Sequence, residues 1–186
     1  MLYTNKDLKR LIIPLIFEQL LAILVGMVDT VMIAGVGEAA VSGVSLVDTI
    51  NILVINITAA LSTGGAVVAG HFLGQKDSEN ASRSAWQLVL FSICLSLIVT
   101  VVFLGAHSPL LRIVFGKVEP EVMKNASTYL VITALSICPL AIYNACAALF
   151  RAMSDSKTTM FISIVMNLIN LVGNAILIYG AKIGVA

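Results

Sequence analysis

The sequence predicts an all-α, polytopic membrane protein with five transmembrane helices. Of its 186 residues, 59% are hydrophobic and 11% are charged, whereas soluble domains carry about 25% charged residues. Five apolar segments reach the length of about 20 residues that a helix needs to cross a bilayer. The links between them are short and hold most of the charged residues. These observations predict a multi-pass bundle of helices rather than a soluble domain.

The first two expected spans cover about 11–35 and 44–70. The run LIIPLIFEQLLAILVGMVDTVMIAG is much longer than the roughly 7–15 apolar residues of a secretory signal, so we expect it to be a retained membrane span. A link rich in Gly and Ala, with Glu38, leads to the second span. We therefore expect an apolar helical hairpin at the start of the chain.

The remaining spans are expected at about 85–107, 126–150 and 158–179. The link before 85–107, HFLGQKDSENASRS, is the most polar stretch of the chain. The link 108–125 holds Pro109, Gly116 and Pro120, and the link 151–157 reads RAMSDSK. Because Gly, Pro and clustered polar residues interrupt helices, these links separate the spans.

We expect the chain to lie in the plasma membrane, and the distribution of Lys and Arg predicts a cytoplasmic N-terminus, because cytoplasmic loops carry the excess of basic residues. The basic residues expected inside are Lys6, Lys9, Arg10, Lys76, Arg83, Arg151 and Lys157. Those expected outside are Arg112, Lys117, Lys124 and Lys182. Five spans then place the C-terminal end of this sequence outside.

Composition and motifs argue against several functional classes. The net charge of +1 and the absence of a basic stripe predict no nucleic-acid partner. Cys94, Cys138 and Cys146 fall in apolar runs, so we interpret them as small packing residues. The chain has no metalloprotease, hydrolase or phosphate-binding motif. We therefore predict that the protein is not an enzyme and needs no cofactor.

The carboxylate of Asp29 is the strongest functional signal in the sequence. It lies deep within the run 11–35, where a charge costs about 2.5–3.5 kcal/mol on insertion scales. Such residues usually face a bundle interior or a hydrated cavity, where they bind an ion, carry a proton or meet a substrate. We therefore predict that Asp29 takes part in transport.

Other polar residues extend this candidate cavity. Glu18 precedes Asp29 by three helical turns and shares its helix face, so it needs a partner elsewhere. Asn170 and Asn174 belong to a polar stripe that begins at Asn167. Further candidates for the cavity are Gln19, Asp48 and Asn51, although Asp48 is also interpreted as either a solvated residue or a helix-start residue. We interpret Asn167 and Asn56 as interhelical hydrogen-bonding residues.

The chemistry of these side chains allows two coupling ions. Hard cations prefer oxygen ligands, so the Asp29 carboxylate with amide oxygens suits sodium. A carboxylate in an apolar environment can equally hold a proton. The residues alone leave both alternatives open.

Four segments in order make the chain resemble the N-terminal half of MATE (multidrug and toxic-compound extrusion) transporters. They are IPLIFEQLLAILVGMVDTVMIAGVGEAAVSGVSL, STGGAVVAGHFLGQKDSENA, CPLAIYNACAALFRAMSDSKTTM and MNLINLVGNAILIYG. The resemblance extends along essentially all 186 residues.

The resemblance implies two six-helix lobes and cation-coupled export of organic, often cationic, compounds. The coupling carboxylate of the family falls on Asp29, and its fourth-helix asparagine falls on Asn144. Two polar positions of the fifth helix fall on Asn170 and Asn174. Because some relatives carry Asp at the last position, Asn174 leaves this set with one carboxylate. In the sodium-coupled alternative, Asp29 is the sodium ligand.

The resemblance also implies that residues 1–186 form one lobe without its sixth helix, and that the second lobe is missing. Transport is therefore expected to need that lobe or another chain. One alternative is a flippase of lipids or lipid-linked oligosaccharides from the same superfamily. The absence of Lys and Arg within the spans disfavours it. Another alternative is a non-transporting membrane module, either truncated or dependent on a partner.

Overall fold

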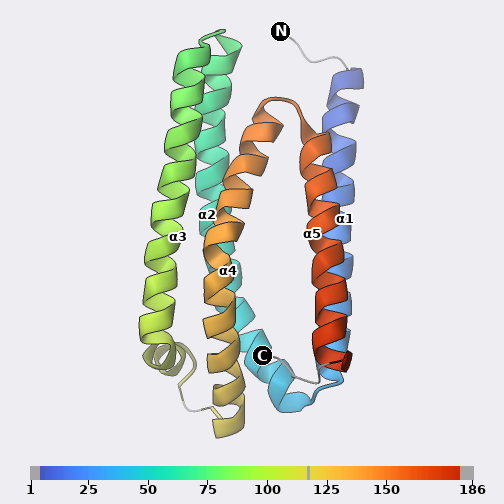
Figure 1. Cartoon of the computed structure of the whole chain (residues 1–186), viewed down its shortest axis with the longest axis vertical. Coiled ribbons are helices and arrows are strands. Elements are labelled where there is room, and N and C mark those ends of the chain that lie inside the picture. The colour runs from blue at the N-terminus through green and yellow to red at the C-terminus, as the bar shows by residue number, and fades with distance from the viewer. Residues whose placement is uncertain (1–4, 117, 181–186) are drawn as a thin grey trace.

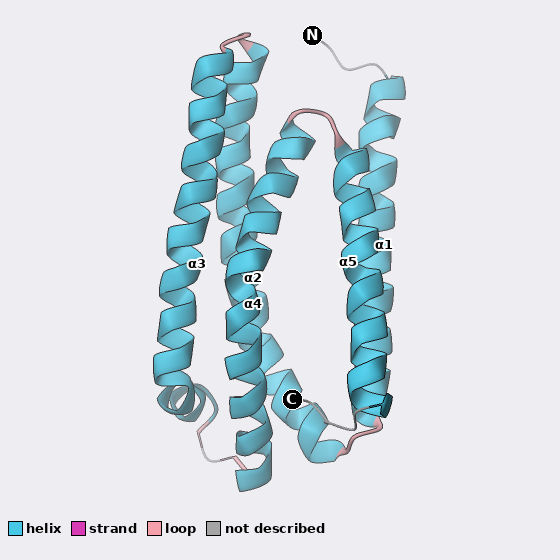
Figure 2. Ribbon diagram, in the orientation of Figure 1, coloured by secondary structure: helices cyan, strands magenta, loops and turns pink. Residues whose placement is uncertain are grey.

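The structure, a computed structural model, describes residues 5–116 and 118–180 as helices joined by short loops (Figure 2). The helices are α1 (Asn5–Ala34), α2 (Glu38–Gly74), α3 (Ser78–Phe115), α4 (Pro120–Ala152) and α5 (Ser156–Ala175), followed by a π-helical turn, η1 (Ile176–Gly180). Within the described residues, five helices are long and apolar enough to cross a membrane. The predicted all-α fold with five spans is thus confirmed.

The helices extend beyond the predicted spans. α2 begins at Glu38 because the Glu- and Ala-rich residues before position 44 favour a helix. α3 continues through Pro109 to Phe115, with a kink at Ala106, where φ is −122° and ψ is 21°. Because proline lacks the N–H that would bond four residues back, the helix bends just before it instead of ending. The link expected at 108–125 is therefore much shorter.

Two turns at the same end of the bundle have the same construction. In each, a residue with left-handed backbone precedes the N-cap of the next helix: Lys76 (φ 61°) before α3 and Ser154 (φ 63°) before α5. Their backbone hydrogen bonds also correspond, because Asp77 N–H donates to the Phe72 carbonyl and Asp155 N–H to the Phe150 carbonyl. Both helical hairpins therefore reverse direction in the same way.

An aspartate caps each of the helices that leave these turns. The Asp77 carboxylate accepts from the Asn80 N–H at 3.1 Å, and the Asp155 carboxylate accepts from the Thr158 N–H at 3.2 Å. The Asn80 Nδ2 and the Thr158 hydroxyl also donate to these carboxylates, each at 2.7 Å. Because hydrogen bonds favour the ionised form, these side-chain bonds, followed by the backbone bonds, hold the pKa of Asp77 and of Asp155 below the usual value.

α2, α3 and α4 pack together as a three-helix unit that contains the core. Its buried residues are Val47, Phe103, Leu111, Ala126, Leu130, Ala134 and Ile137, with a second cluster of Ala66, Leu88, Ala145 and Ala148. Small residues allow close approach of membrane helices. At Gly43 an added Cβ would lie 3.0 Å from the Ala126 backbone nitrogen and 3.1 Å from the Val122 carbonyl oxygen. This glycine therefore sets the spacing of α2 and α4.

α1 packs mainly against α5, and this pair stands beside the three-helix unit with few contacts to it (Figure 1). The apolar side chains of the pair are largely exposed, because only 6% of each of its two apolar windows is buried. In a bilayer such surfaces face lipid or further protein. The described helices thus form two groups: a packed unit of α2, α3 and α4, and a pair, α1 and α5, with fewer buried side chains. The boundary between the two groups is called the seam below.

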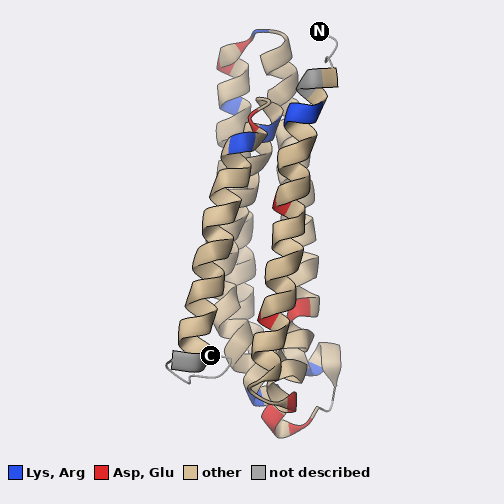
Figure 3. Ribbon diagram, turned by 90° about the vertical axis from the view of Figure 1, so that its right-hand side faces the viewer, with Lys and Arg blue, Asp and Glu red and all other residues tan. Residues whose placement is uncertain are grey.

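Basic residues gather at the end of the bundle that carries the N-terminus, as Figure 3 shows. The described ones near this end are Lys9, Arg10, Lys76, Arg83, Arg151 and Lys157, whereas Arg112 and Lys124 lie near the other end. Lys117 and Lys182 lie outside the described residues, and the side chain of Lys6 is not described. The described basic residues that were expected on one side of the membrane therefore lie at one end of the bundle, and those expected on the other side lie at the other end. The orientation of the bundle in the membrane stays a prediction.

Candidate functional site

A cavity of about 420 Å³ lies in the seam, in the half of the bundle away from the N-terminal end. Four helices and the π-turn line it. Its lining residues are Gly26, Asp29, Thr30, Ile33, Val41, Val44, Ser45, Asp48, Tyr129, Ile132, Thr133, Ser136, Asn170, Asn174, Leu177 and Ile178. Two carboxylates and no Lys, Arg or His are among these described residues. The cavity therefore presents an acidic, oxygen-rich surface.

Asp29 is held on this surface by Asn174 of α5, which also bonds to Asn170. The Asn174 Nδ2 donates to Asp29 Oδ1 at 3.0 Å and to Asn170 Oδ1 at 3.3 Å. Asn170 and Asn174 are one turn apart, so both reach the same side of α5. The structure thus brings three of the predicted site residues together, with the Asn174 amide nitrogen between the Asp29 carboxylate and the Asn170 amide oxygen.

Asp48 faces the same cavity from α2. The Tyr129 hydroxyl of α4 donates to Asp48 Oδ1 at 3.3 Å, and Asn51 also interacts with this carboxylate. The interpretation of Asp48 as a residue at a helix start is wrong, because α2 begins at Glu38. Asp48 is half-buried and lies well inside the helix. Its contact with Tyr129 depends on the close approach of α2 and α4 at Gly43.

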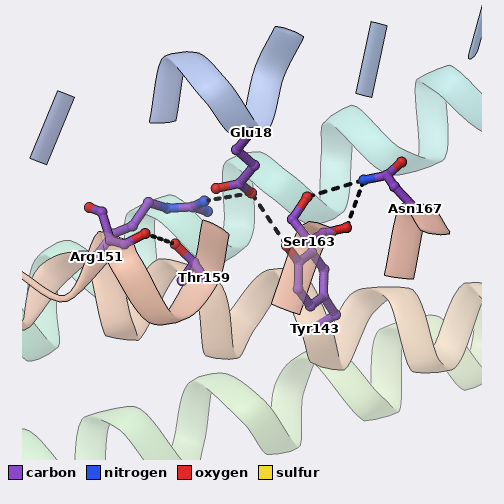
Figure 4. Close-up of polar contacts among 7 residues, drawn as sticks. Glu18, Tyr143, Arg151, Thr159, Ser163 and Asn167 are labelled. Atoms are coloured by element: carbon purple, nitrogen blue, oxygen red, sulfur yellow. Dashed lines mark hydrogen bonds and ion pairs between the residues drawn. The ribbon is translucent and has the colours of Figure 1, made fainter. Parts of the chain in front are cut away.

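A second polar cluster joins α1 to α4, closer to the N-terminal end (Figure 4). The Tyr143 hydroxyl donates to Glu18 Oε1 at 3.3 Å, and the Arg151 guanidinium lies 3.6 Å from the same oxygen. Tyr143 also interacts with Ser163 of α5. Arg151 is therefore the partner expected for Glu18, and Tyr143 lies beside this ion pair.

The remaining predicted residues lie apart from the cavity lining. Asn144 is half-buried on α4, next to Tyr143, and its Nδ2 has no hydrogen-bond partner among the described residues. Gln19 is exposed. The Asn167 Nδ2 donates to the Ser163 carbonyl at 2.8 Å and to the Ser163 hydroxyl at 3.2 Å. Asn167 thus bonds within its own helix in the contacts described, and its interhelical role stays a prediction.

Sequence reasoning missed Tyr129 and the small hydroxyl residues of the cavity, Ser45, Thr133 and Ser136. A tyrosine hydroxyl within an apolar span needs a hydrogen-bond partner, so Tyr129 carried a usable signal. The hydroxyls of Ser and Thr can bond to their own helix, as Thr133 does to the Tyr129 carbonyl at 2.9 Å. Such residues therefore give little sequence signal of their position at a cavity.

Comparisons with known proteins agree on one family. The MatE family model matches residues 14–176. The chain is 28% identical over 168 residues to the uncharacterized transporter YisQ of Bacillus subtilis. This alignment covers 90% of this chain and 36% of YisQ. It is 27% identical over 176 residues to the probable multidrug resistance protein NorM of Thermotoga maritima, covering 95% of this chain and 38% of NorM.

Solved structures have the same fold. An outward-facing multidrug resistance MATE transporter of the MOP superfamily superposes with a TM-score of 0.90 at 23% identity, covering 97% of this chain and 40% of that one. A MOP superfamily transporter from Pyrococcus furiosus, described as having a binding pocket of reversed polarity, gives a TM-score of 0.90 at 23% identity, with 97% and 39% coverage. This chain thus spans well under half the length of the relatives and structures that it matches. With the family model covering most of its residues, the chain belongs to the MatE family.

Proposed function

We propose that this chain is the N-terminal lobe of a cation-coupled antiporter that exports organic, cationic compounds across the plasma membrane. The coupling cation, sodium or a proton, binds at Asp29, and Asn170 and Asn174 supply neutral oxygens beside it. Asn144, which stands outside the cavity lining, is proposed to join this set when α4 and α5 rearrange.

The observation that carries this proposal is the acidic cavity between the two helix groups. Asp29 and Asp48 enter one space of about 420 Å³ from different helices, without a basic side chain among the described lining residues. Buried carboxylates are stabilised by cations, so a coupling ion and a positively charged substrate suit this cavity. An anionic lipid-linked substrate does not, which disfavours the flippase alternative.

The donor set supports either coupling ion through the same residues. Sodium takes oxygen ligands. The Asp29 carboxylate and the amides of Asn170 and Asn174 stand on facing helices, and Asn174, which donates its Nδ2 to Asp29 without the ion, turns its Oδ1 toward a bound sodium ion in this alternative. A proton needs only the Asp29 carboxylate, with the Asn174 amide holding its other oxygen. No group of three or more His, Cys, Asp or Glu side chains suited to a metal occurs in the described part of the chain. Amide oxygens are therefore essential to the sodium alternative.

Transport across the whole membrane is proposed to need a second lobe, supplied by the same or another chain. Carriers built from repeats alternate access by moving one repeat against the other around a central site. The largely exposed apolar surfaces of α1 and α5 support this view, because they leave room for lipid and further helices.

Asp29→Asn tests the proposal directly. The chain in its native form, with any second lobe it possesses, is reconstituted into liposomes, and ethidium movement is followed under an imposed sodium gradient or pH gradient. We expect one gradient to drive ethidium transport and Asp29→Asn to abolish it. Glu79→Gln, which removes an exposed carboxylate at the start of α3, is the matched control and should transport normally.

Two results would contradict the proposal. Gradient-driven transport by Asp29→Asn at the rate of the unmodified protein would remove Asp29 from coupling. Failure of both gradients to drive ethidium in the unmodified protein would remove the antiporter assignment. The gradient that succeeds identifies the coupling ion.

A further inference from the structure

Polar links between the α1–α5 pair and the three-helix unit gather at one level of the bundle. Glu18 of α1 binds Tyr143 and Arg151 of α4, and Ser163 of α5 interacts with the same tyrosine. By contrast, the Asp29–Asn174 bond lies within the pair. In Figure 4 the labelled side chains of Glu18, Tyr143 and Arg151 point toward one another across the seam.

This cluster lies between the cavity and the N-terminal end of the bundle on α1 and α4. Glu18 precedes Asp29 by eleven residues, which is about 16 Å along α1. On α4, which runs back toward the N-terminal end, Tyr143 follows the cavity residue Tyr129 by fourteen residues, or about 21 Å. A path along the seam from the N-terminal end to the cavity therefore passes the cluster.

The same order holds on α5, the third helix that contributes to the cluster. Ser163 precedes the cavity residue Asn170 by seven residues, or about 10 Å, and α5 starts at the N-terminal end of the bundle. Three helices thus place their cluster residues on the same side of the cavity. The cluster therefore bridges the two helix groups on that side of the cavity.

The closed arrangement leaves polar atoms without partners. Glu18 Oε1 receives both contacts, at 3.3 Å and 3.6 Å, whereas Glu18 Oε2 is buried without a hydrogen-bond partner among the described residues. The neighbouring Asn144 Nδ2 is in the same condition. Buried polar groups without partners destabilise the closed state. When the seam opens, water can bond to these groups, and this gain offsets part of the free energy lost when the ion pair breaks. The contact is therefore suited to breaking and re-forming.

We propose that Glu18, Tyr143 and Arg151 form a latch that closes the Asp29 cavity toward the N-terminal end, and that the α1–α5 pair separates from the unit when the latch opens. Glu18 acts as a positioning residue in this scheme and touches neither ion nor substrate. The inference rests on the proposed function in taking the cavity as the transport site. Its test measures access to the cavity, which does not depend on transport.

The test labels a cysteine in the cavity. Cys94, Cys138 and Cys146 are replaced by Ala in the full native chain, and Ser45→Cys is introduced into the cavity lining. A cationic methanethiosulfonate is added to sealed vesicles from the side of the N-terminal end. Ser82→Cys, at an exposed position near that end of α3, verifies the sidedness. The measured quantity is the rate of modification of Ser45→Cys.

We expect Glu18→Gln and Arg151→Gln each to raise this rate by about fivefold, the smallest ratio typical of a coupled two-state change. Glu79→Gln and Arg83→Gln alter the same residue types at exposed positions of α3 and should leave the rate unchanged. Glu18→Arg combined with Arg151→Glu should restore slow labelling, because the pair re-forms with its charges exchanged.

Rates for folded Glu18→Gln and Arg151→Gln that match their controls would overturn the latch. A rise that the charge exchange does not reverse would also overturn it. Tyr143→Phe keeps the ring and removes one hydroxyl, so it provides the test if the charge variants do not fold: a faster rate supports the latch and an unchanged rate overturns it. An Asp29→Asn variant that still transports would contradict the proposed function while leaving the labelling result valid.

Discussion

Gly43→Ala tests whether the close approach of α2 and α4 organises the site. The added Cβ would lie 3.0 Å from the Ala126 nitrogen, 3.0 Å from the Asn125 Cβ and 3.1 Å from the Val122 carbonyl oxygen. Carbon atoms in good contact are about 3.5–4.0 Å apart. Because two of the three obstructing atoms belong to the α4 backbone, they cannot rotate away, and the two helices must separate by about 0.5 Å.

Two opposing terms set the magnitude of this effect. Overpacking of a well-packed site costs about 1–3 kcal/mol, while Ala in place of Gly stabilises a helix by about 1 kcal/mol. Gly64→Ala isolates the second term, since an added Cβ at Gly64 would meet nothing within 4 Å. We therefore expect Gly43→Ala to be less stable than Gly64→Ala by about 1–3 kcal/mol. Separation of the helices should also lengthen the Asp48–Tyr129 hydrogen bond.

The two variants can be compared by unfolding in mixed micelles with increasing dodecyl sulfate, followed by the loss of helical ellipticity. Linear extrapolation of the free energy of unfolding gives the difference between them. Equal stabilities for Gly43→Ala and Gly64→Ala, within about 0.5 kcal/mol, would refute the close-packing argument. The same result would remove the reason given for the position of Asp48.

Three further predictions concern the turns and the cavity. Lys76→Gly should stabilise the protein by about 1 kcal/mol in the same micelle assay, because its left-handed backbone is unfavourable for a residue with a Cβ; a loss of stability would contradict this. The pKa of Asp155 is lowered by its bonds to Thr158, so the stability contributed by this cap is present above the ordinary value of 3.8 and is lost as pH falls through the lower folded value; unfolding curves between pH 5 and 2 should show Asp155→Asn to be less sensitive to acid. Asn174→Leu should weaken binding of the coupling cation because it removes the amide beside Asp29, and isothermal titration of the identified cation would show unchanged affinity if this is incorrect.

The sequence predicts the spans well because membrane helices follow from uninterrupted apolar length, which is a local property. The limits of the helices are harder to predict, since Pro109 bends α3 without ending it and the residues before position 44 already belong to α2. Asp29 is identifiable from its depth in an apolar run. The four-residue spacing of Asn170 and Asn174 is likewise enough to predict that they share one helix face.

The sequence could not assign partners across helices. Glu18 needs a partner, but only the packing of α1 beside the end of α4 selects Arg151 and Tyr143. The sequence pattern is compatible with Asp48 at a helix start, whereas the position of Tyr129 on α4 makes Asp48 part of the cavity. Asn144 is assigned by family resemblance, and its role in the coupling set stays a prediction.

By itself, the sequence predicted five membrane-spanning helices, a carboxylate within the first of them and a resemblance to one half of a MATE transporter, and the described residues form five helices of sufficient length. These conclusions depend on hydrophobic length, on helical periodicity and on short motifs, all of which are local. The tertiary structure decided that α1 pairs with α5, that two carboxylates share one cavity, and that Glu18 contacts Tyr143 and Arg151 of α4. These features depend on contacts between residues far apart in sequence, where small residues such as Gly43 set the distance between helices.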